Sequence, residues 1–435
     1  MSPTTKGIVV VCAGFCLSLS LGSLFVWLPI AVELLRPLAD GGSYGWTVRQ
    51  VSVPFAVGAA SFVLAMVGGG RIQDRLGPRW PATIGGVFIG LGTILASMSR
   101  DRLDDPEMLA VFTVLGLGLM VGSGAGLTFS SLIPPAVKWT VKRHSGLVAG
   151  VVTAGFASGP AWVNGRILSL VQTYGVSSVL LVQGIVLLAV IVGLSQMLEN
   201  PLVGYVAPGS YLYEEGPLAG PLPWAGLTPR HTISTLAFRA LWTSGAILAT
   251  ATAFLSVRLT VALMQDPPGG ALLVAGFALA GSLGGVAAGG LHDRFGVLGL
   301  PGVFAVVAVT LGLAALLSAL GYVEPAVFFC AASGVGSVVV AWVATMECFG
   351  TRNSGGNFGL VFSGWALGML LGAVLAVSSV GRDLGIAGRG SAQIPASIGL
   401  ALLLVSAVVL AAKVRRPSPT GDRNLQRRPR GGTTG

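Results

Sequence analysis

Twelve runs of at least eighteen residues contain no Asp, Glu, Lys or Arg, and together they fill most of this 435-residue chain. A helix that crosses the hydrocarbon core of a bilayer needs about 20 consecutive apolar residues. The runs therefore predict an all-α membrane protein with twelve transmembrane helices. They cover residues 7–32, 50–70, 80–99, 108–137, 144–165, 167–198, 240–257, 267–292, 295–323, 325–346, 353–381 and 390–412.

Composition excludes other architectures. Charged residues make up 10% of the chain and the mean hydropathy is +0.82, whereas a soluble domain carries about 25% charged residues. The strands of a membrane β-barrel would be segments of about 10 residues that alternate in polarity, not unbroken apolar runs. The connections are too short for a soluble enzyme domain of about 100 residues, so we expect no enzymatic activity and no cofactor.

The longest polar interval divides the runs six and six. It contains six prolines between residues 199 and 239, as a linker with surface turns does. We therefore expect an N-terminal six-helix bundle at 1–198, a linker at 199–239, a C-terminal six-helix bundle at 240–412 and a disordered basic tail at 413–435.

The distribution of basic residues predicts the orientation. With both termini in the cytosol, cytosolic segments carry 18 of the 26 Lys and Arg residues, seven of them in the tail. Cytoplasmic loops are enriched in Lys and Arg, so we expect a multi-pass protein of the plasma (inner) membrane with both termini inside. The net charge of +10 follows from this topology and does not indicate a nucleic-acid partner.

An internal repeat supports two pseudo-symmetric halves. The segment G-R-I-Q-D-R-L-G at 70–77 is followed 219 positions later by G-G-L-H-D-R-F-G at 289–296. Likewise R-H-S-G at 143–146 is followed 209 positions later by R-N-S-G at 352–355. Secondary transporters build one binding site at the interface of such duplicated halves.

The first of these turns, residues 70–79, resembles the G-x-x-x-D-R-x-G-R-R pattern of the major facilitator superfamily, with Pro78 in place of the first closing arginine. The resemblance implies two six-helix bundles that rock about a shared site. We expect Asp74 to accept hydrogen bonds from the amides at the helix start near Ser354, because the helix dipole favours an anion there. Asp293 is expected to do the same near Ser145.

These contacts would join the halves on the inner side and would break when the protein opens inward. A solvated basic turn that only fixes topology is the alternative interpretation. The predicted gate residues are Gly70, Asp74, Arg75, Gly77, Arg79, Arg143, Asp293, Arg294, Glu347 and Arg352.

Within the superfamily, the chain is similar to the oxalate/formate antiporters and their monocarboxylate porter relatives. The similar segments are 68–86, 136–139, 143–146, 228–229 and 347–350. That family holds carboxylates with one basic residue on helix 8 and another on helix 11. The corresponding positions here are about Gly285 and Trp365, so both cations are missing and a dianion is a poor candidate for the cargo.

The residues predicted to line the cargo site combine aromatic, amide and basic side chains. Arg166 and Arg258 are expected near the outer ends of their helices, where snorkelling into headgroups is the alternative. The deep tryptophans could equally face lipid or pack in the core. The predicted substrate-binding residues are Trp27, Phe129, Trp162, Asn164, Arg166, Arg258 and Trp365.

No metal site is indicated, since the four cysteines lie within or at the end of apolar runs and the three histidines are separated on the predicted cytosolic side. The same placement argues against a proton relay at mid-depth. The coupling ion is therefore unknown, with a proton as the candidate.

We expect a monomeric secondary active transporter of a small organic solute, with a monocarboxylate as the leading class. A drug or metabolite exporter is an alternative, favoured by the helix 5 pattern of Gly146, Gly155 and Gly159-Pro160. A membrane sensor or scaffold that does not transport is a third interpretation. The solute and the lipid bilayer are the expected partners.

Overall fold

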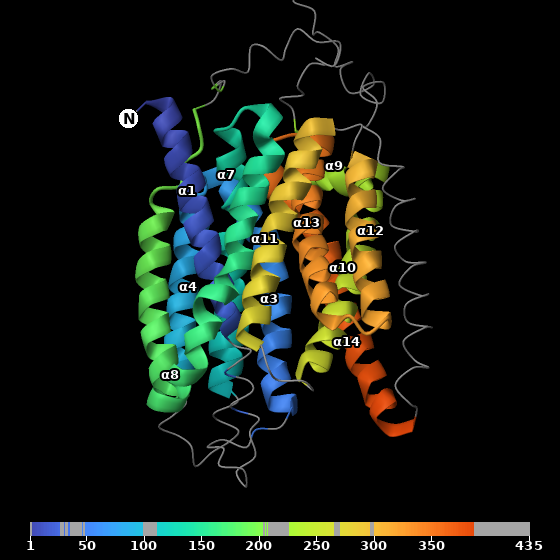
Figure 1. Cartoon of the computed structure of the whole chain (residues 1–435). Coiled ribbons are helices and arrows are strands. Elements are labelled where there is room, and N and C mark those ends of the chain that lie inside the picture. Colours follow the sequence, from blue (N-terminus) through green and yellow to red (C-terminus); the bar gives the residue numbers. More distant parts are fainter. Residues whose placement is uncertain are drawn as a thin grey trace, which may run out of the picture.

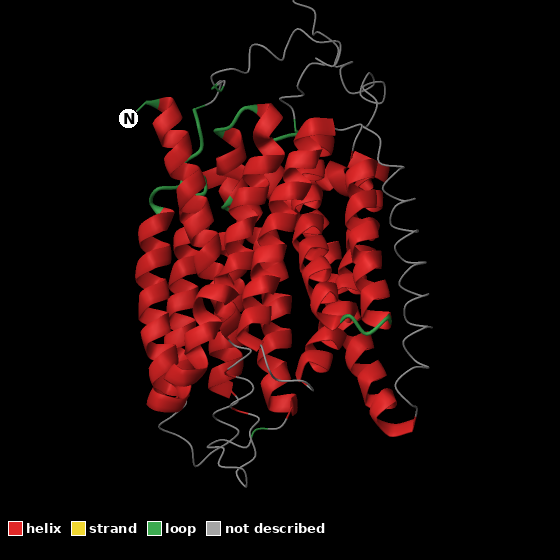
Figure 2. Cartoon of the chain, viewed as in Figure 1, coloured by secondary structure: helices red, strands yellow, loops and turns green. Residues whose placement is uncertain are grey.

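The computed structural model describes most of the two expected halves. The described residues are 2–26, 30, 34, 46, 48–98, 111–202, 205, 207, 226–264, 270–295 and 300–386, and within them every regular element is helical (Figure 2). The expected twelfth span at 390–412, the tail at 413–435 and Trp27 lie outside these residues.

The N-terminal half begins with α1 (Pro3–Gly22), where Ser2 Oγ accepts a hydrogen bond from the Thr5 amide at 3.2 Å and Pro3 starts the helix. η1 (Ser23–Val26), α3 (Val48–Leu76) and α4 (Arg79–Ser97) follow (Figure 1). The fourth span is interrupted: a π-helix, η4 (Val114–Val121), leads into α6 (Gly122–Phe129) and, after a short turn, α7 (Ile133–Lys138). Two prolines in the first turn of α7 cannot donate to the preceding turn, so the helix restarts there.

The fifth and sixth spans meet at a glycine. After η5 (Lys142–His144), α8 runs from Ser145 to Ser195 and contains two helical segments that join at Gly175, whose φ is 79°. The chain reverses direction there (Figure 1). The expected break at Arg166 is therefore wrong: a charged residue does not end a helix, whereas glycine adopts the left-handed conformation that the reversal requires.

The C-terminal half begins inside the expected linker. α9 (Pro229–Ser234) and α10 (Leu236–Met264) precede α11 (Gly270–Phe295), α12 (Leu300–Ala319), α13 (Val323–Phe349) and α14 (Ser354–Ile386). α13 ends at Gly350, whose φ is 83°. Such a residue at a helix C-terminus stops the helix and frees the chain to start α14.

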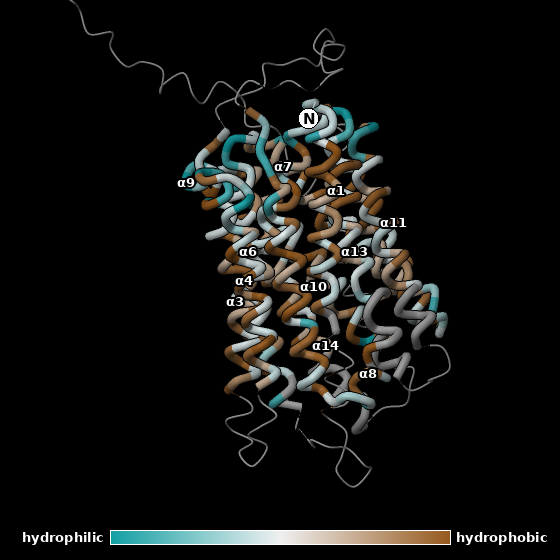
Figure 3. The backbone as a smooth tube through the Cα atoms, turned by 90° about the vertical axis from the view of Figure 1, so that its left-hand side faces the viewer, coloured by the Kyte–Doolittle hydropathy of each residue, from teal (hydrophilic) through white to brown (hydrophobic). Residues whose placement is uncertain are grey.

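The outer faces of the helices are apolar. Eight described helices are long and apolar enough to cross a membrane, and two shorter apolar helices accompany them. Large side chains such as Leu64 (75% exposed), Val309 (70%) and Leu279 (62%) point away from the protein. A hydrophobic surface of this extent is typical of contact with lipid, and hydrophilic residues gather instead near the N-terminus and α9 (Figure 3). We call this end of the bundle the linker end.

Two pairs of helices join the halves. α8 packs along α11, and α3 packs along α14. Each half also has its own core, around Leu17, Ile89 and Ile191 in the N-terminal half and around Phe304 and Leu311 in the C-terminal half. α13 also contacts α8, so the surface shared by the halves lies between α3 and α8 on one side and α11, α13 and α14 on the other.

Candidate functional site

Asp74 joins the end of α3 to the start of α14. Its Oδ1 accepts a hydrogen bond from the Gly355 amide at 3.1 Å, and its Oδ2 accepts one from the Gly356 amide at 2.8 Å. Amides in the first turn of a helix have no partner within the helix and lie at the positive end of its dipole. The contact predicted from the sequence is therefore confirmed, and we call it the α3–α14 latch.

Asp293 makes the symmetric contact. Its Oδ1 accepts a hydrogen bond from the Gly146 amide and its Oδ2 one from the Leu147 amide, both at 2.7 Å. This α8–α11 latch pairs an acceptor in the C-terminal half with donors in the N-terminal half, the reverse of the first latch. Together the two latches cross-link the halves at the linker end.

Glycines allow the helices to come this close. A Cβ on Gly70 would collide with the backbone of Gly355, and a Cβ on Gly146 would collide with the carbonyl of Gly289. Gly77, with a φ of 91°, makes the turn between α3 and α4. The geometry of both latches therefore depends on these small residues.

Contact between α8 and α11 extends well beyond the latch. The hydroxyls of Ser158 and Ser282 lie 2.8 Å apart, and Ser282 Oγ also lies 3.1 Å from the Ala154 carbonyl. Ser158 is twelve residues beyond Gly146, or about 18 Å along a helix. The two helices are thus in contact from the latch at the linker end to about 18 Å along α8.

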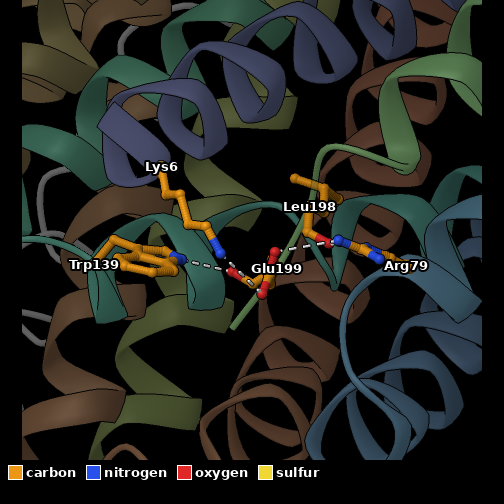
Figure 4. Close-up of polar contacts among 5 residues, drawn as sticks. All are labelled: Lys6, Arg79, Trp139, Leu198 and Glu199. Atoms are coloured by element: carbon orange, nitrogen blue, oxygen red, sulfur yellow. Dashed lines mark hydrogen bonds and ion pairs between the residues drawn. The ribbon is translucent and has the colours of Figure 1, made fainter. Parts of the chain in front are cut away.

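Arg79 and Glu347, both predicted gate residues, contact partners in their own half. Figure 4 shows Arg79 donating from Nε to the Leu198 carbonyl at 2.9 Å and pairing with Glu199 at 3.2 Å. Glu347 Oε2 lies 3.1 Å from His292 Nε2. The remaining predicted gate cations are exposed at the linker end: Arg75, Arg143, Arg294 and Arg352.

The linker is held at both of its described ends. Glu199 also accepts a hydrogen bond at its carbonyl from Trp139 Nε1 at 2.7 Å, and its carboxylate lies 3.8 Å from Lys6 Nζ (Figure 4). At the other end, Asn357 Nδ2 donates to the Leu227 carbonyl at 2.9 Å. The first anchor belongs to the N-terminal half and the second to α14.

Aromatic side chains from both halves meet along the helix pairs. The N-terminal half contributes from α3, α6 and α8, and the C-terminal half from α13 and α14, with ring centroids 4.8–6.0 Å apart for the pairs Phe362–Trp365 and Phe62–Phe362. We call this group the interface aromatic cluster. Its members are Phe62, Phe129, Phe156, Trp342, Phe358, Phe362 and Trp365.

Two predicted cargo-site residues belong to this cluster. Phe129 lies 6.2 Å from Phe362, and Phe362 stacks on Trp365 at 4.8 Å. Trp365 Nε1 also donates a hydrogen bond to Ser337 Oγ at 3.2 Å. The other members were not predicted, although the spacing of Phe358, Phe362 and Trp365 places them on one helix face.

The other predicted cargo-site residues are not brought into the cluster by any described contact. Trp162, Asn164 and Arg166 lie in α8, but their side chains are outside the description, as is Trp27. Arg258 is partly buried near the end of α10 that is opposite the linker end. Gly285 lies on α11 against Val335, where a Cβ would approach that side chain to 2.9 Å.

Of the helix 5 glycines, Gly146 faces α11 at the latch, whereas Gly155 and Gly159 pack within the N-terminal half. A Cβ on Gly155 would lie 3.0 Å from the Leu19 amide, and one on Gly159 would collide with Gly22. Both glycines therefore fit α1 against α8, which is the helix-packing interpretation of this pattern.

Comparison with known proteins agrees with the sequence resemblance. A family model described as the Major Facilitator Superfamily matches residues 10–373. The oxalate:formate antiporter of Oxalobacter formigenes is 25% identical over 194 residues, which are 42% of this chain and 44% of that protein. YhjX of Escherichia coli strain K12, described as an uncharacterized MFS-type transporter, is 23% identical over 363 residues, or 79% of this chain and 86% of that protein. The match to the antiporter thus covers less than half of that relative.

Solved structures share the fold. A crystal structure of a variant of the E. coli fucose:proton symporter FucP has a TM-score of 0.67 at 12% identity, covering 96% of this chain and 100% of that one. A structure of FucP in the outward conformation has a TM-score of 0.63 at 14% identity, covering 93% and 99%. The predicted fold class is confirmed. Since the family model covers most of the chain and the fold agrees, the protein belongs to the major facilitator superfamily, as a multi-pass membrane transporter and not an enzyme.

Proposed function

We propose that the protein moves a small organic solute of at most one charge across the plasma membrane by alternating access, with the interface aromatic cluster as part of its binding surface. The observation that carries the proposal is the position of this cluster, which draws aromatic rings from both halves. A solute bound there would contact both halves, so its binding would depend on how the two halves are arranged. Such sites at the interface of repeats are the rule in secondary transporters.

Rocking of the halves requires the two latches to break. In the closed arrangement Asp74 and Asp293 hold the linker end shut. Opening that end would separate each carboxylate from its helix start, while the opposite end closes around the solute. We propose that the linker end faces the cytosol and that the working unit is a monomer.

The uncharged character of the cluster supports a monoanion or neutral compound over a dianion. Trp365 offers an indole face. The positions at which the oxalate/formate antiporters carry cations correspond here to about Gly285 and Trp365, and both are uncharged. An anion that loses its hydration without a compensating charge is strongly disfavoured in a low-dielectric site. A monocarboxylate is the first solute class to test, and oxalate is expected to be a poor substrate.

The test is counterflow in proteoliposomes with labelled monocarboxylates, oxalate and a lipophilic cation. Trp365→Ala should raise the half-saturating concentration of the best substrate by about 2- to 10-fold, the equivalent of 0.5–1.5 kcal/mol for an aromatic contact. Trp80→Ala is the matched control, since Trp80 is 60% exposed at the start of α4. Saturable oxalate transport as tight as that of the best monocarboxylate, unaffected by Trp365→Ala, would refute the proposal.

A drug or metabolite exporter is the second candidate. The aromatic cluster favours it, because the faces of Trp and Phe rings attract organic cations. In the same experiment, counterflow of the lipophilic cation with no monocarboxylate transport would support this candidate over the first.

A further inference from the structure

The two latches are related by the repeat, but their charged neighbours differ. The displacement of 219 that takes Asp74 to Asp293 also takes Gln73 to His292. The displacement of 209 that takes Gly146 to Gly355 also takes Lys138 to Glu347. An uncharged residue in one half is thus replaced by a titratable one, and a cation by a carboxylate.

In the α3–α14 latch the nearby cation is a lysine. Lys138 at the end of α7 is close enough to Asp74 to attract it electrostatically. Gln73 is fully buried beside them, and neither atom of its amide has a hydrogen-bond partner among the described residues. The carboxylate of this latch is therefore accompanied by a lysine, and the residue at the repeat position of His292 is an uncharged glutamine.

In the α8–α11 latch, the one described side chain that can place a positive charge between the carboxylates is a histidine. His292 is 2% exposed, with Nε2 at 3.1 Å from Glu347 Oε2 and Nδ1 at 3.8 Å from Asp293 Oδ1. No described residue forms a hydrogen bond with Nδ1. The imidazole thus lies between two carboxylates, one of which is the latch itself.

The other ionisable side chains that the structure describes around this cluster lie at the surface, and that of Lys142 in η5 is outside the description. Arg294 follows on the same helix, and Arg143 and His144 precede the first turn of α8; all three are exposed. α12 contains no ionisable residue, and the second acid of α13, Glu324, is exposed at the opposite end of that helix. His292 is therefore the group through which the charge of this buried cluster can change.

Closure of the latch favours the protonated imidazole. A neutral His292 would leave the partly buried carboxylates of Glu347 and Asp293 with no cation between them, and their mutual repulsion would be stronger there than in water. When the linker end opens, water reaches the cluster and screens the carboxylates, so the pairing matters less. The closed state consequently holds the proton more tightly than the open state, and stability of the closed state is lost as the pH rises.

We propose that His292 is a proton-binding site that secures the α8–α11 latch when protonated, so that opening of the linker end releases a proton there. The α3–α14 latch has Gln73 at the position that corresponds to His292, so we expect no histidine-linked pH dependence there. The site makes the conformational equilibrium depend on pH in the absence of any cargo, which separates this inference from the proposed transport function.

The test measures the distance between spin labels at Met197 and Phe295, which are 51% and 57% exposed at the linker end in opposite halves. The full-length protein in nanodiscs carries Cys12→Ser and Cys16→Ser, which remove the exposed native thiols. The label pair should show a short distance in the closed state and a long distance in the open state. As the pH rises from about 6 to about 10, one linked proton should lower the ratio of the closed to the open population by up to about tenfold per pH unit.

Substitutions distinguish the effect of protonating His292 from the effect of other charges near the latches. His292→Gln, which copies Gln73 of the other half, should abolish the pH dependence, and His292→Lys should keep the short distance at every pH. Lys138→Gln is the matched control: it should lower the closed fraction at every pH while keeping the slope. A wild-type slope in His292→Gln, or no slope in the unsubstituted chain, would overturn the proposal.

A further variant tests the site without changing His292, in case the histidine variants do not fold. Glu347→Gln removes one of the two carboxylates that hold the proton, so the midpoint of the transition should shift to lower pH. An unchanged midpoint in this variant would contradict the proposed site, whatever solute the protein moves.

Discussion

At the scale of single residues, each latch uses one carboxylate to satisfy two backbone amides. The first amides of a helix have no intrahelical partner, and an anion there contributes about 0.3–1 kcal/mol. Both oxygens of Asp74 and of Asp293 are engaged. An asparagine would keep one acceptor and lose the charge.

Asp74→Asn should therefore weaken the closed state of the linker end by about 0.3–1 kcal/mol, or up to about 2 kcal/mol because the contact is partly buried. We expect slower counterflow with normal membrane insertion. Initial rates in proteoliposomes and the yield of inserted protein measure the two effects. The control is Glu324→Gln, an exposed carboxylate at the opposite end; turnover at the wild-type rate in Asp74→Asn would show that the latch does not govern transport.

Gly70→Ala should obstruct the same latch by volume instead of charge. Its Cβ would collide with the Gly355 backbone, and overpacking of this kind costs about 1–3 kcal/mol. Gly68→Ala is the matched control, since a Cβ there meets nothing within 4 Å. Spin-label distances across the linker end should lengthen for Gly70→Ala alone, and equal distances in both variants would contradict the close approach.

At the scale of helices, charge-free runs predict how many helices there are better than where they end. The latches were predictable because Asp74 and Asp293 recur at repeat positions and helix starts attract anions. The reversal at Gly175 was missed because Arg166, the nearest charge, lies inside the helix. Phe62 and Phe156 were missed for another reason: the contacts of their rings, with Phe362 of α14 and Phe129 of α6 respectively, depend on how distant helices pack.

Gly175→Ala should destabilise the joint between the two segments of α8. Gly175 has a φ of 79° and a ψ of 159°, a region that is essentially restricted to glycine and that costs a residue with a Cβ about 1–3 kcal/mol. Gly193→Ala, in the helical part of α8 with open space around its Cβ position, should be neutral or slightly stabilising. Thermal unfolding in detergent compares the two, and equal melting temperatures would contradict the assigned conformation.

At the scale of the whole molecule, the latches, the linker anchors and α9 all lie at one end of the bundle (Figure 1). The hydrophilic residues concentrated there contrast with the apolar flanks of the helices (Figure 3). The bias of basic residues toward cytoplasmic segments predicts that this end faces the cytosol.

Cysteine labelling tests this orientation. An impermeant thiol reagent added to intact cells should label a cysteine at Asp104 and spare one at Glu215, two positions that lie outside the described residues. Permeabilised cells serve as the control, since both cysteines should then react. Equal labelling in intact cells would contradict the predicted topology.

Because the linker is bound to the protein at both of its ends, its extended length sets the largest distance by which those two ends can separate. Glu199 is bound to the N-terminal half and Leu227 to α14, and the chain between residues 207 and 226 can extend to about 65 Å. That maximum length is large compared with the few ångströms needed to break a hydrogen bond at a latch. The linker therefore sets no limit on opening at its natural length, and deletions within it should leave the amplitude of rocking unchanged until the linker becomes taut.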